Sequence, residues 1–187
     1  NNPTGSYVTG ADIKRLREEL KQLEQVASVT SLLDVPLVES PPMTLAEITR
    51  AARTLESDDV NIKLAEREMR NSPLYRNLLV NSQGDTTALQ VNLAINQKLH
   101  DLVDNREKLL EKANTIPDSS QRMAELSAQI KIENIAQKQR TEQTIAAVRM
   151  IMDGHRAEAT LYLGGVPMIA SDSIGFIRND LKIFGIG

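Results

Sequence analysis

Cysteine is absent from this chain of 187 residues, and aromatic residues make up only 3% of it. The lack of cysteine excludes disulfides, thiolate nucleophiles and cysteine-ligated zinc sites, and it is compatible with the periplasm and the cytosol alike. With so few aromatic side chains, the chain also offers few platforms on which nucleic-acid bases stack. Thiol chemistry is excluded and base recognition is disfavoured.

The chain also lacks a strong charge excess and a long apolar run. Its formal net charge is -3 with 25% charged residues, which is an ordinary solvated surface rather than a nucleic-acid or polybasic membrane patch. No stretch approaches the roughly 20 apolar residues of a membrane span, and no signal peptide opens the chain. A hydrophobic content of 41% supports one core, or one core plus an appendage. We therefore expect one soluble domain that binds no nucleic acid.

Residues suited to catalysis or metal binding are few. His100 and His155 are the two histidines, and neither has a second histidine four residues away or a nearby set of ligands. This spacing predicts neither a zinc site nor a catalytic triad. Gly164-Gly165 lacks the third glycine and the Lys-Ser/Thr pair of a phosphate-binding loop. We expect no enzymatic activity, no cofactor and no metal site.

The first predicted element is an amphipathic helix over residues 11–23. Thr9 and Asp12 fit a capping box at its start. Apolar residues share one face of this helix, namely Ile13, Leu16, Leu20 and Leu23.

A strand is predicted next, over residues 29–35, because β-branched and leucine residues dominate there and Pro36 ends the run. After a proline-containing linker, Thr44 and Glu47 form a second capping box, which predicts a helix that reaches Leu55.

Paired aspartates, Asp58 and Asp59, predict the start of a further short helix that runs to about Met69. Two adjacent carboxylates also suit a metal ion, but at a helix start they are far more often partners of the helix dipole. We assign no metal to them.

A β-hairpin is predicted for residues 78–93. Two strands, residues 78–81 and 86–93, flank a turn in which Gly84 supplies the positive φ. Apolar residues alternate with small or polar ones in the second strand, which is typical of one buried and one wet face. The apolar set is Leu89, Val91 and Leu93.

Residues 96–154 are almost wholly helical and polar in pattern. Leucines at heptad-like spacings predict one helix, residues 117–120 predict a turn and N-cap, and a longer helix follows up to Gly154. The longer helix carries Met123, Leu126, Ile130 and Ile135, and later Ile145, Val148, Ile151 and Met152. The sparse apolar seam indicates a helical hairpin that either contacts a neighbour or stands solvated without a partner.

The last stretch predicts a strand, a turn and a helix. Residues 160–163 form a short apolar run, Gly164-Gly165 breaks it, and residues 171–184 place apolar side chains on one helical face. The chain then ends in apolar residues without a cap.

Three ordered stretches carry a family resemblance. The residues concerned are Val26, Ser28, Val29, Thr30, Ser31, Leu32, Leu33, Asp34, Val35 and Pro36; Ser72, Pro73, Leu74, Tyr75, Arg76, Leu79, Val80, Ser82, Gly84, Thr86, Thr87, Ala88 and Leu89; and Gly165, Val166, Pro167, Phe176, Ile177, Arg178, Asp180, Leu181, Phe184 and Gly185. In this order they resemble the first extracytoplasmic domain of resistance-nodulation-division (RND) exporters, in particular the hydrophobe/amphiphile efflux and MmpL-like branch. The third stretch is similar to the passage from that domain into the second transmembrane helix.

The resemblance implies a periplasmic loop domain between transmembrane helices 1 and 2 of a proton-driven exporter in the inner membrane. Such a domain helps to bind and conduct hydrophobic, amphiphilic or lipid-like substrates by rigid-body rocking, while proton relay belongs to the membrane helices. Its partners would be those helices and a second periplasmic domain. Coupling to the following membrane helix would fall to Phe184, Gly185, Ile186 and Gly187.

The alternative is a non-catalytic scaffold or adaptor that docks another chain through residues 96–154. Both functions hold together if this arm forms a homo-oligomer or reaches a periplasmic partner. An apolar cleft between sheet and helices would favour the exporter, whereas an exposed apolar stripe on the arm would favour the scaffold.

The predicted fold is α+β: a small mixed or antiparallel sheet covered by helices, as in the split βαβ pattern of porter subdomains, with a projecting helical hairpin. Residues 1–95 and 155–187 would form the porter-like domain, and residues 96–154 the inserted hairpin. The sheet should contain residues 29–35, 78–81, 86–93 and 160–163, with helices 11–23 and 171–184 on one face. The resemblance implies a strand before the first helix. Only Tyr7 and Val8 could belong to that strand.

Overall fold

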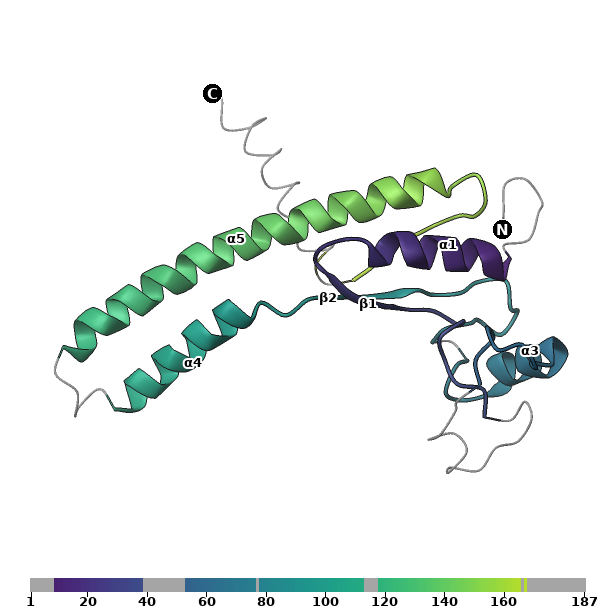
Figure 1. Ribbon diagram of the computed structural model, residues 1–187, viewed down its shortest axis with the longest axis horizontal. Helices are drawn as coiled ribbons and strands as arrows, with labels where there is room; N and C mark the ends of the chain where they lie inside the picture. The colour runs from purple at the N-terminus through teal and green to yellow at the C-terminus, as the bar shows by residue number, and fades with distance from the viewer. Residues whose placement is uncertain (1–8, 39–52, 77, 113–117, 166, 168–187) are drawn as a thin grey trace, which may run out of the picture. The chain divides into compact units, whose positions relative to one another are not determined.

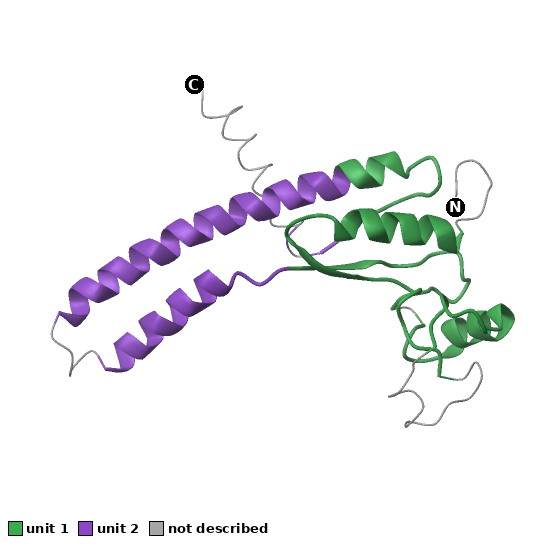
Figure 2. Ribbon diagram, in the orientation of Figure 1, with its two compact units in different colours: residues 1–93, 150–162 green, residues 94–149, 163–187 purple. Residues whose placement is uncertain are grey.

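A computed structural model describes residues 9–38, 53–76, 78–112, 118–165 and 167 of the chain (Figure 1). The chain divides into two compact units, residues 1–93 with 150–162 and residues 94–149 with 163–187 (Figure 2). Within the described part, no helix combines the length and the apolar character that crossing a bilayer requires.

In the first unit, helix α1 (Gly10–Lys21) begins with the predicted capping box. The Thr9 hydroxyl oxygen accepts from the Asp12 amide at 3.3 Å, and the Asp12 carboxylate accepts from the Thr9 amide at 2.9 Å. The box thereby adds a side-chain acceptor to each of two backbone amides at the helix start. Ile13, Leu16 and Leu20 of the predicted apolar face are buried, whereas Leu23 lies beyond the end of the helix and is half-buried.

The sheet of the first unit pairs β1 (Val26–Thr30) with β2 (Gln90–Leu93) in antiparallel register, and α1 packs against β1. Val29 faces Val91, while the register shifts between Val26 and Ser28. The side chain that anchors this sheet is Val29, which is 4% exposed. Helices with a small antiparallel sheet confirm the α+β class.

The four-stranded sheet predicted from the sequence is wrong for the described residues, in which the sheet has two strands. The first strand begins earlier than predicted and ends at Thr30, because Asp34 folds the next residues into a turn. Its carboxylate accepts from the Ser31 amide at 2.8 Å and from the Ser31 hydroxyl at 2.7 Å. Short polar side chains that bond nearby backbone compete in this way with a strand ladder.

The other two predicted strands are also corrected. Residues 78–81 contribute an antiparallel bridge, Val80 to Thr87, and a parallel bridge, Arg76 to Val80, rather than a strand. Residues 160–163 adopt no strand in the described chain, and Tyr162 is 90% exposed there. A short apolar run without burial gains little from an extended, paired conformation.

Helix α3 (Ile62–Asn71) contributes Ala65 and Met69 to a small core that Leu37 and Tyr75 complete. Its N-cap is Asn61, whose side-chain oxygen accepts from the Leu64 amide at 3.3 Å. The prediction that Asp58 and Asp59 cap this helix is therefore wrong. The helix starts later, and Asp59 pairs instead with Arg53 at 2.9 Å.

The predicted turn around Gly84 is confirmed. The Asn81 amide donates to the Thr86 carbonyl at 3.1 Å, and Gly84 has φ of 73°. Glycine is needed here because other residues rarely adopt this conformation. The Arg70 guanidinium also lies over this glycine, so that a Cβ would sit 2.5 Å from its Nε.

The second unit consists mainly of α4 (Gln97–Glu111) and residues 119–149 of α5 (Ser119–Gly154), which run antiparallel (Figure 2). Both predicted helices are thus present. The assignment of Ile135 to the seam is wrong, because Ile135 is 52% exposed while Glu133 is buried. Helix α4 has no buried residues, so polar contacts carry much of the connection between the two helices.

Several predictions fall outside the described residues. They are the helix that starts at Thr44, the helix over residues 171–184, the coupling residues Phe184, Gly185, Ile186 and Gly187, and the remnant strand at Tyr7 and Val8. Leu55, at the predicted end of the first of these helices, lies in a turn.

The geometry at Gly84 yields a testable prediction. Gly84→Ala should lower the free energy of unfolding by about 1–2 kcal/mol, because alanine is strained at this positive φ and its Cβ displaces Arg70. Urea unfolding measures the change. Gly154→Ala is the matched control, since a Cβ there meets nothing within 4 Å and alanine favours a helix. Equal effects of the two substitutions would contradict the assignment of strain to Gly84.

Candidate functional site

Arg17 is a buried charged side chain of the first unit, with 4% of its side chain exposed. It lies on the same face of α1 as Leu16 and Leu20, where the sequence pattern calls for an apolar residue. A buried guanidinium is tolerated only where carboxylates and hydrogen bonds compensate for its lost hydration.

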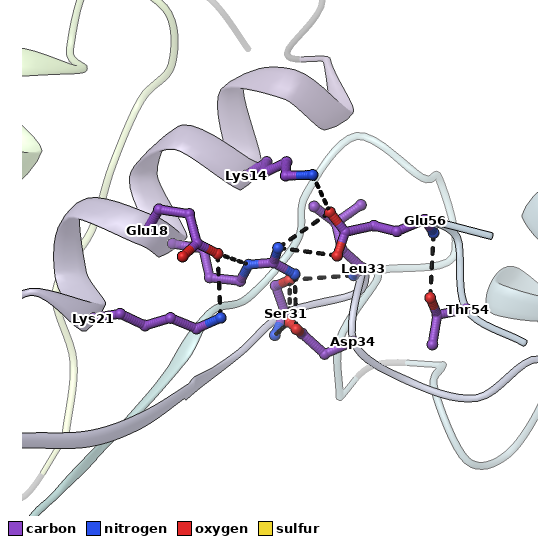
Figure 3. A network of polar contacts seen from close by, with 9 residues as sticks. Lys14, Glu18, Lys21, Ser31, Leu33, Asp34, Thr54 and Glu56 are labelled. Carbon is purple, nitrogen blue, oxygen red and sulfur yellow. Dashed lines mark hydrogen bonds and ion pairs between the residues drawn. The ribbon is translucent and has the colours of Figure 1, made fainter. Parts of the chain in front are cut away.

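The partners of Arg17 come from three segments of the chain (Figure 3). One terminal nitrogen donates to Asp34 at 2.7 Å, in the turn that follows β1. The other donates to both oxygens of Glu56, at 2.9 and 3.1 Å. The Nε atom donates to Glu18 at 3.0 Å. A single side chain therefore links α1, the end of β1 and the loop around residue 56.

The charges of this network shift the pKa of both main acceptors downward. Partial burial acts to raise the pKa of Asp34, but hydrogen bonds from Ser31 and Arg17 outweigh it and hold that pKa below its usual 3.8. Hydrogen bonds from Lys14 first, and then from Arg17, hold the pKa of Glu56 below its usual 4.5. Both groups are ionised near neutral pH, as acceptors for a permanent cation must be.

Glu133 is the centre of a second network, which lies in the second unit. Its side chain is 9% exposed and accepts from Lys98 at 2.8 Å and from Arg140 at 2.6 Å. The side-chain amide nitrogen of Asn96 also donates to Glu133 at 3.0 Å. The side-chain oxygen of Asn96 caps α4 by accepting from the Leu99 amide at 3.1 Å. Hydrogen bonds from Lys98, Arg140 and Asn96, in that order, lower the pKa of Glu133 to about 2.

The two histidines differ sharply in their surroundings. His155 is 6% exposed and lies between Glu158 and Glu19. The side chain of His100 is 61% exposed, with Nε2 at 3.7 Å from Asp104. No cluster in the described ranges has three or more groups arranged to hold a metal ion.

Neither Arg17 nor Glu133 was predicted from the sequence, although each occupies a position that the helical pattern marks as buried. Arg17 completes the pattern of residues 13, 16, 17 and 20 on the buried face of α1. Glu133 continues the spacing of Leu126 and Ile130 along α5. A charged residue at such a position predicts a buried partner, but its partners lie far along the chain.

No known family model, no curated protein and no solved structure matches this chain.

Removal of the Arg17 charge should destabilise the first unit. Arg17→Gln is expected to lower the free energy of unfolding at pH 7 by about 2–3 kcal/mol, because it removes the buried cation that bridges Asp34 and Glu56. Lys14→Gln is the matched control: Lys14 pairs with the same Glu56 at 2.9 Å but is 59% exposed. Its loss should cost less than about 1 kcal/mol. Urea unfolding of both variants measures the difference.

The pKa shifts of Asp34 and Glu56 also predict how the stability of the protein changes with pH. In the folded state the pKa values of Asp34 and Glu56 lie below their ordinary values. The two carboxylates therefore stabilise the fold fully at any pH above their ordinary pKa values. This stabilisation is lost as the pH falls through their folded-state pKa values. Wild-type stability should therefore fall on acidification below about pH 4.5, and less steeply in Arg17→Gln. Parallel pH profiles for the two proteins would refute this role of Arg17.

Protonation of Glu133 should loosen the helical hairpin. The pKa of Glu133 in the folded state, about 2, lies below the ordinary 4.5. Glu133 therefore stabilises the hairpin fully above pH 4.5, and this stabilisation is lost as the pH falls toward the folded-state pKa. Glu133→Gln should mimic the protonated state and speed amide exchange at the start of α4 at neutral pH. Glu125→Gln is the control, because Glu125 is exposed and contacts only Gln121 by a described hydrogen bond. Equal exchange in both variants would exclude Glu133 as the link.

Proposed function

We propose that this chain is a periplasmic porter-type domain of a proton-driven RND exporter, which helps to bind and conduct hydrophobic, amphiphilic or lipid-like substrates. The observation that carries the proposal is the presence of three ordered stretches that resemble this family. They occur in the same order as in the first extracytoplasmic domain of such exporters, and they span much of the chain outside residues 96–154.

Contacts between the first two stretches support the proposal. The Tyr75 hydroxyl, from the second stretch, donates a hydrogen bond to the Pro36 carbonyl of the first. Tyr75 is 5% exposed and shares its core with Leu37, directly after that first stretch. Residues that are separate in the sequence thus form one substructure, as expected if both stretches belong to one kind of domain.

The individual residues of these stretches also have definable structural tasks. Asp34 bonds to Ser31 to end β1 and also accepts from Arg17, Gly84 forms the turn after Asn81, and the Thr87 hydroxyl donates to the Leu79 carbonyl at 2.9 Å. The resemblance therefore lies in residues that build the domain. A porter-like fold of the split βαβ type is part of the proposal.

The proposed mechanism is rigid-body rocking of this domain, driven by membrane helices that relay protons elsewhere in the protein. Phe184, Gly185, Ile186 and Gly187 would transmit the movement to the membrane helix that follows. The domain itself would contribute binding surface and motion, and no proton chemistry of its own.

A scaffold that docks a partner through the helical hairpin is the second candidate. It is favoured by exposed apolar side chains on α4 and α5, namely Leu110 at 67%, Ile132 at 67% and Ile135 at 52%. Ile132 and Ile135 are three residues apart and so lie on neighbouring positions of one helical face. Exposed apolar groups of this kind mark interaction surfaces.

Transport by the full-length protein in proteoliposomes separates the two candidates. The exporter should move a lipophilic fluorescent amphiphile only while a proton gradient exists, and a scaffold should move none. Phe184→Ala should lower the initial rate several-fold, because it removes the largest apolar group of the coupling segment. Tyr162→Ala is the matched control, since Tyr162 is an aromatic residue that is 90% exposed. Gradient-independent signals throughout an amphiphile panel would contradict the proposal.

A further inference from the structure

The imidazole of His155 connects the segment that follows α5 to α1, within the first unit. Its Nε2 atom lies 3.1 Å from a carboxylate oxygen of Glu19, on α1, and its Nδ1 atom lies 3.0 Å from a carboxylate oxygen of Glu158. Glu19 and His155 are 136 positions apart in the sequence. The ring is 6% exposed, so water replaces neither contact easily.

The chemistry of this arrangement depends on the number of protons on the ring. An ionised carboxylate accepts hydrogen bonds and donates none, whereas a neutral imidazole has one N–H and one lone pair. Only the doubly protonated imidazolium donates to Glu19 and Glu158 at the same time. After the loss of one proton, a lone pair faces a carboxylate oxygen across about 3 Å and the contact becomes repulsive.

The charges around His155 decide which contact fails first. Glu158 also pairs with Arg15 of α1, and hydrogen bonds from His155 and then Arg15 lower the pKa of Glu158. Glu19 has no other ion-pair partner among the residues that the structure describes. Glu158 therefore keeps a cation when the ring becomes neutral, and Glu19 loses its own.

The remaining charged groups near the ring do not replace this cation. Asp12 faces Arg15 at 3.6 Å and is itself held in the α1 capping box. Arg156 pairs with Asp153 at 2.6 Å and also donates to the Leu161 carbonyl. Arg15 attracts Glu19 electrostatically but bonds directly to Glu158, so the direct contact to Glu19 depends on His155.

We propose that His155, Glu19 and Glu158 form a pH-operated clasp that fixes the segment after α5 to α1 when the ring is doubly protonated and releases it from Glu19 when the ring is neutral. The clasp is closed on the acidic side of the imidazole titration and opens as the pH rises. Histidine is the side chain that proteins commonly use for pH-dependent changes of charge.

The clasp does not depend on the exporter proposal. If that proposal also holds, the released segment leads toward the coupling residues at 184–187, and an acidic periplasm would fix α1 to that path. This consequence alone rests on the proposed function. Failure of the clasp experiment would leave the transport experiment unaffected, and the reverse is also true.

The test combines nitrogen NMR of the two histidine rings with amide hydrogen exchange on the full chain. The clasp requires that both ring nitrogens of His155 carry a proton at the acidic end of a series from about pH 5.5 to 8, and only one at its basic end. Over the same interval, amide exchange at residues 19–22 and 155–159 should become about tenfold faster, after correction for its intrinsic pH dependence. Amides of the β1–β2 pair should change little and serve as the internal reference.

Three variants make the test specific. His155→Gln should exchange rapidly at both pH values, because the neutral amide of glutamine leaves Glu19 and Glu158 without the positive charge of the imidazolium. Glu19→Gln should remove the pH dependence while keeping the link, because the amide of glutamine donates to an unprotonated ring nitrogen and its oxygen accepts from a protonated one. His100→Gln is the control and should keep the wild-type ratio, since His100 is exposed.

Several results would overturn the clasp. One is a His155 ring that keeps a single protonation state from about pH 5.5 to 8. Another is unchanged exchange of residues 19–22 and 155–159 while the ring titrates. A third is a Glu19→Gln variant with the wild-type pH ratio. If His155→Gln fails to fold, Glu19→Gln decides the question, because it retains the histidine.

Discussion

The buried guanidinium of Arg17 is the interaction on which the first unit depends most. Two paired strands are marginally stable in water by themselves, and here they are β1 and β2 alone among the described residues. Arg17 adds bonds from α1 to Asp34 at the end of β1 and to Glu56 in a distant loop. The same helix turns a second polar edge, Arg15 and Glu19, toward the segment after α5. Helix α1 is therefore held by apolar packing on one face and by ionic contacts at both edges.

Local physics made α1 and the Gly84 turn predictable. A capping box, an apolar face and a glycine at a positive φ are all decided by residues a few positions apart. The sheet was not predictable in this way. β1 stops at Thr30 because Asp34 bonds back to Ser31, and a β-branched run gives no sign of that competition. The N-cap of α3 was misplaced for a similar reason, since Asp58, Asp59 and Asn61 are all good caps and Arg53 decides among them by binding Asp59.

The partners in the polar networks were even less predictable from the sequence. Glu133 and Ile135 compete for the seam of α5, and hydrophobicity favours Ile135. The structure buries Glu133 because Lys98 and Asn96 come from α4 to meet it. Likewise His155 and Glu158 are neighbours in the sequence, but nothing in the sequence shows that Glu19 completes the site. A charged residue at a buried position predicts that a partner exists, while only the fold identifies the partner.

The proposal that this chain is a domain of an RND exporter can be decided by the sequence that flanks it in the full-length protein. We expect one transmembrane helix before residue 1, a group of membrane helices after Gly187, and a second half that repeats this plan. A full-length protein without membrane helices on either side would contradict the claim. The exposed isoleucines of the helical hairpin would then become the leading evidence, and docking of a partner chain the leading function.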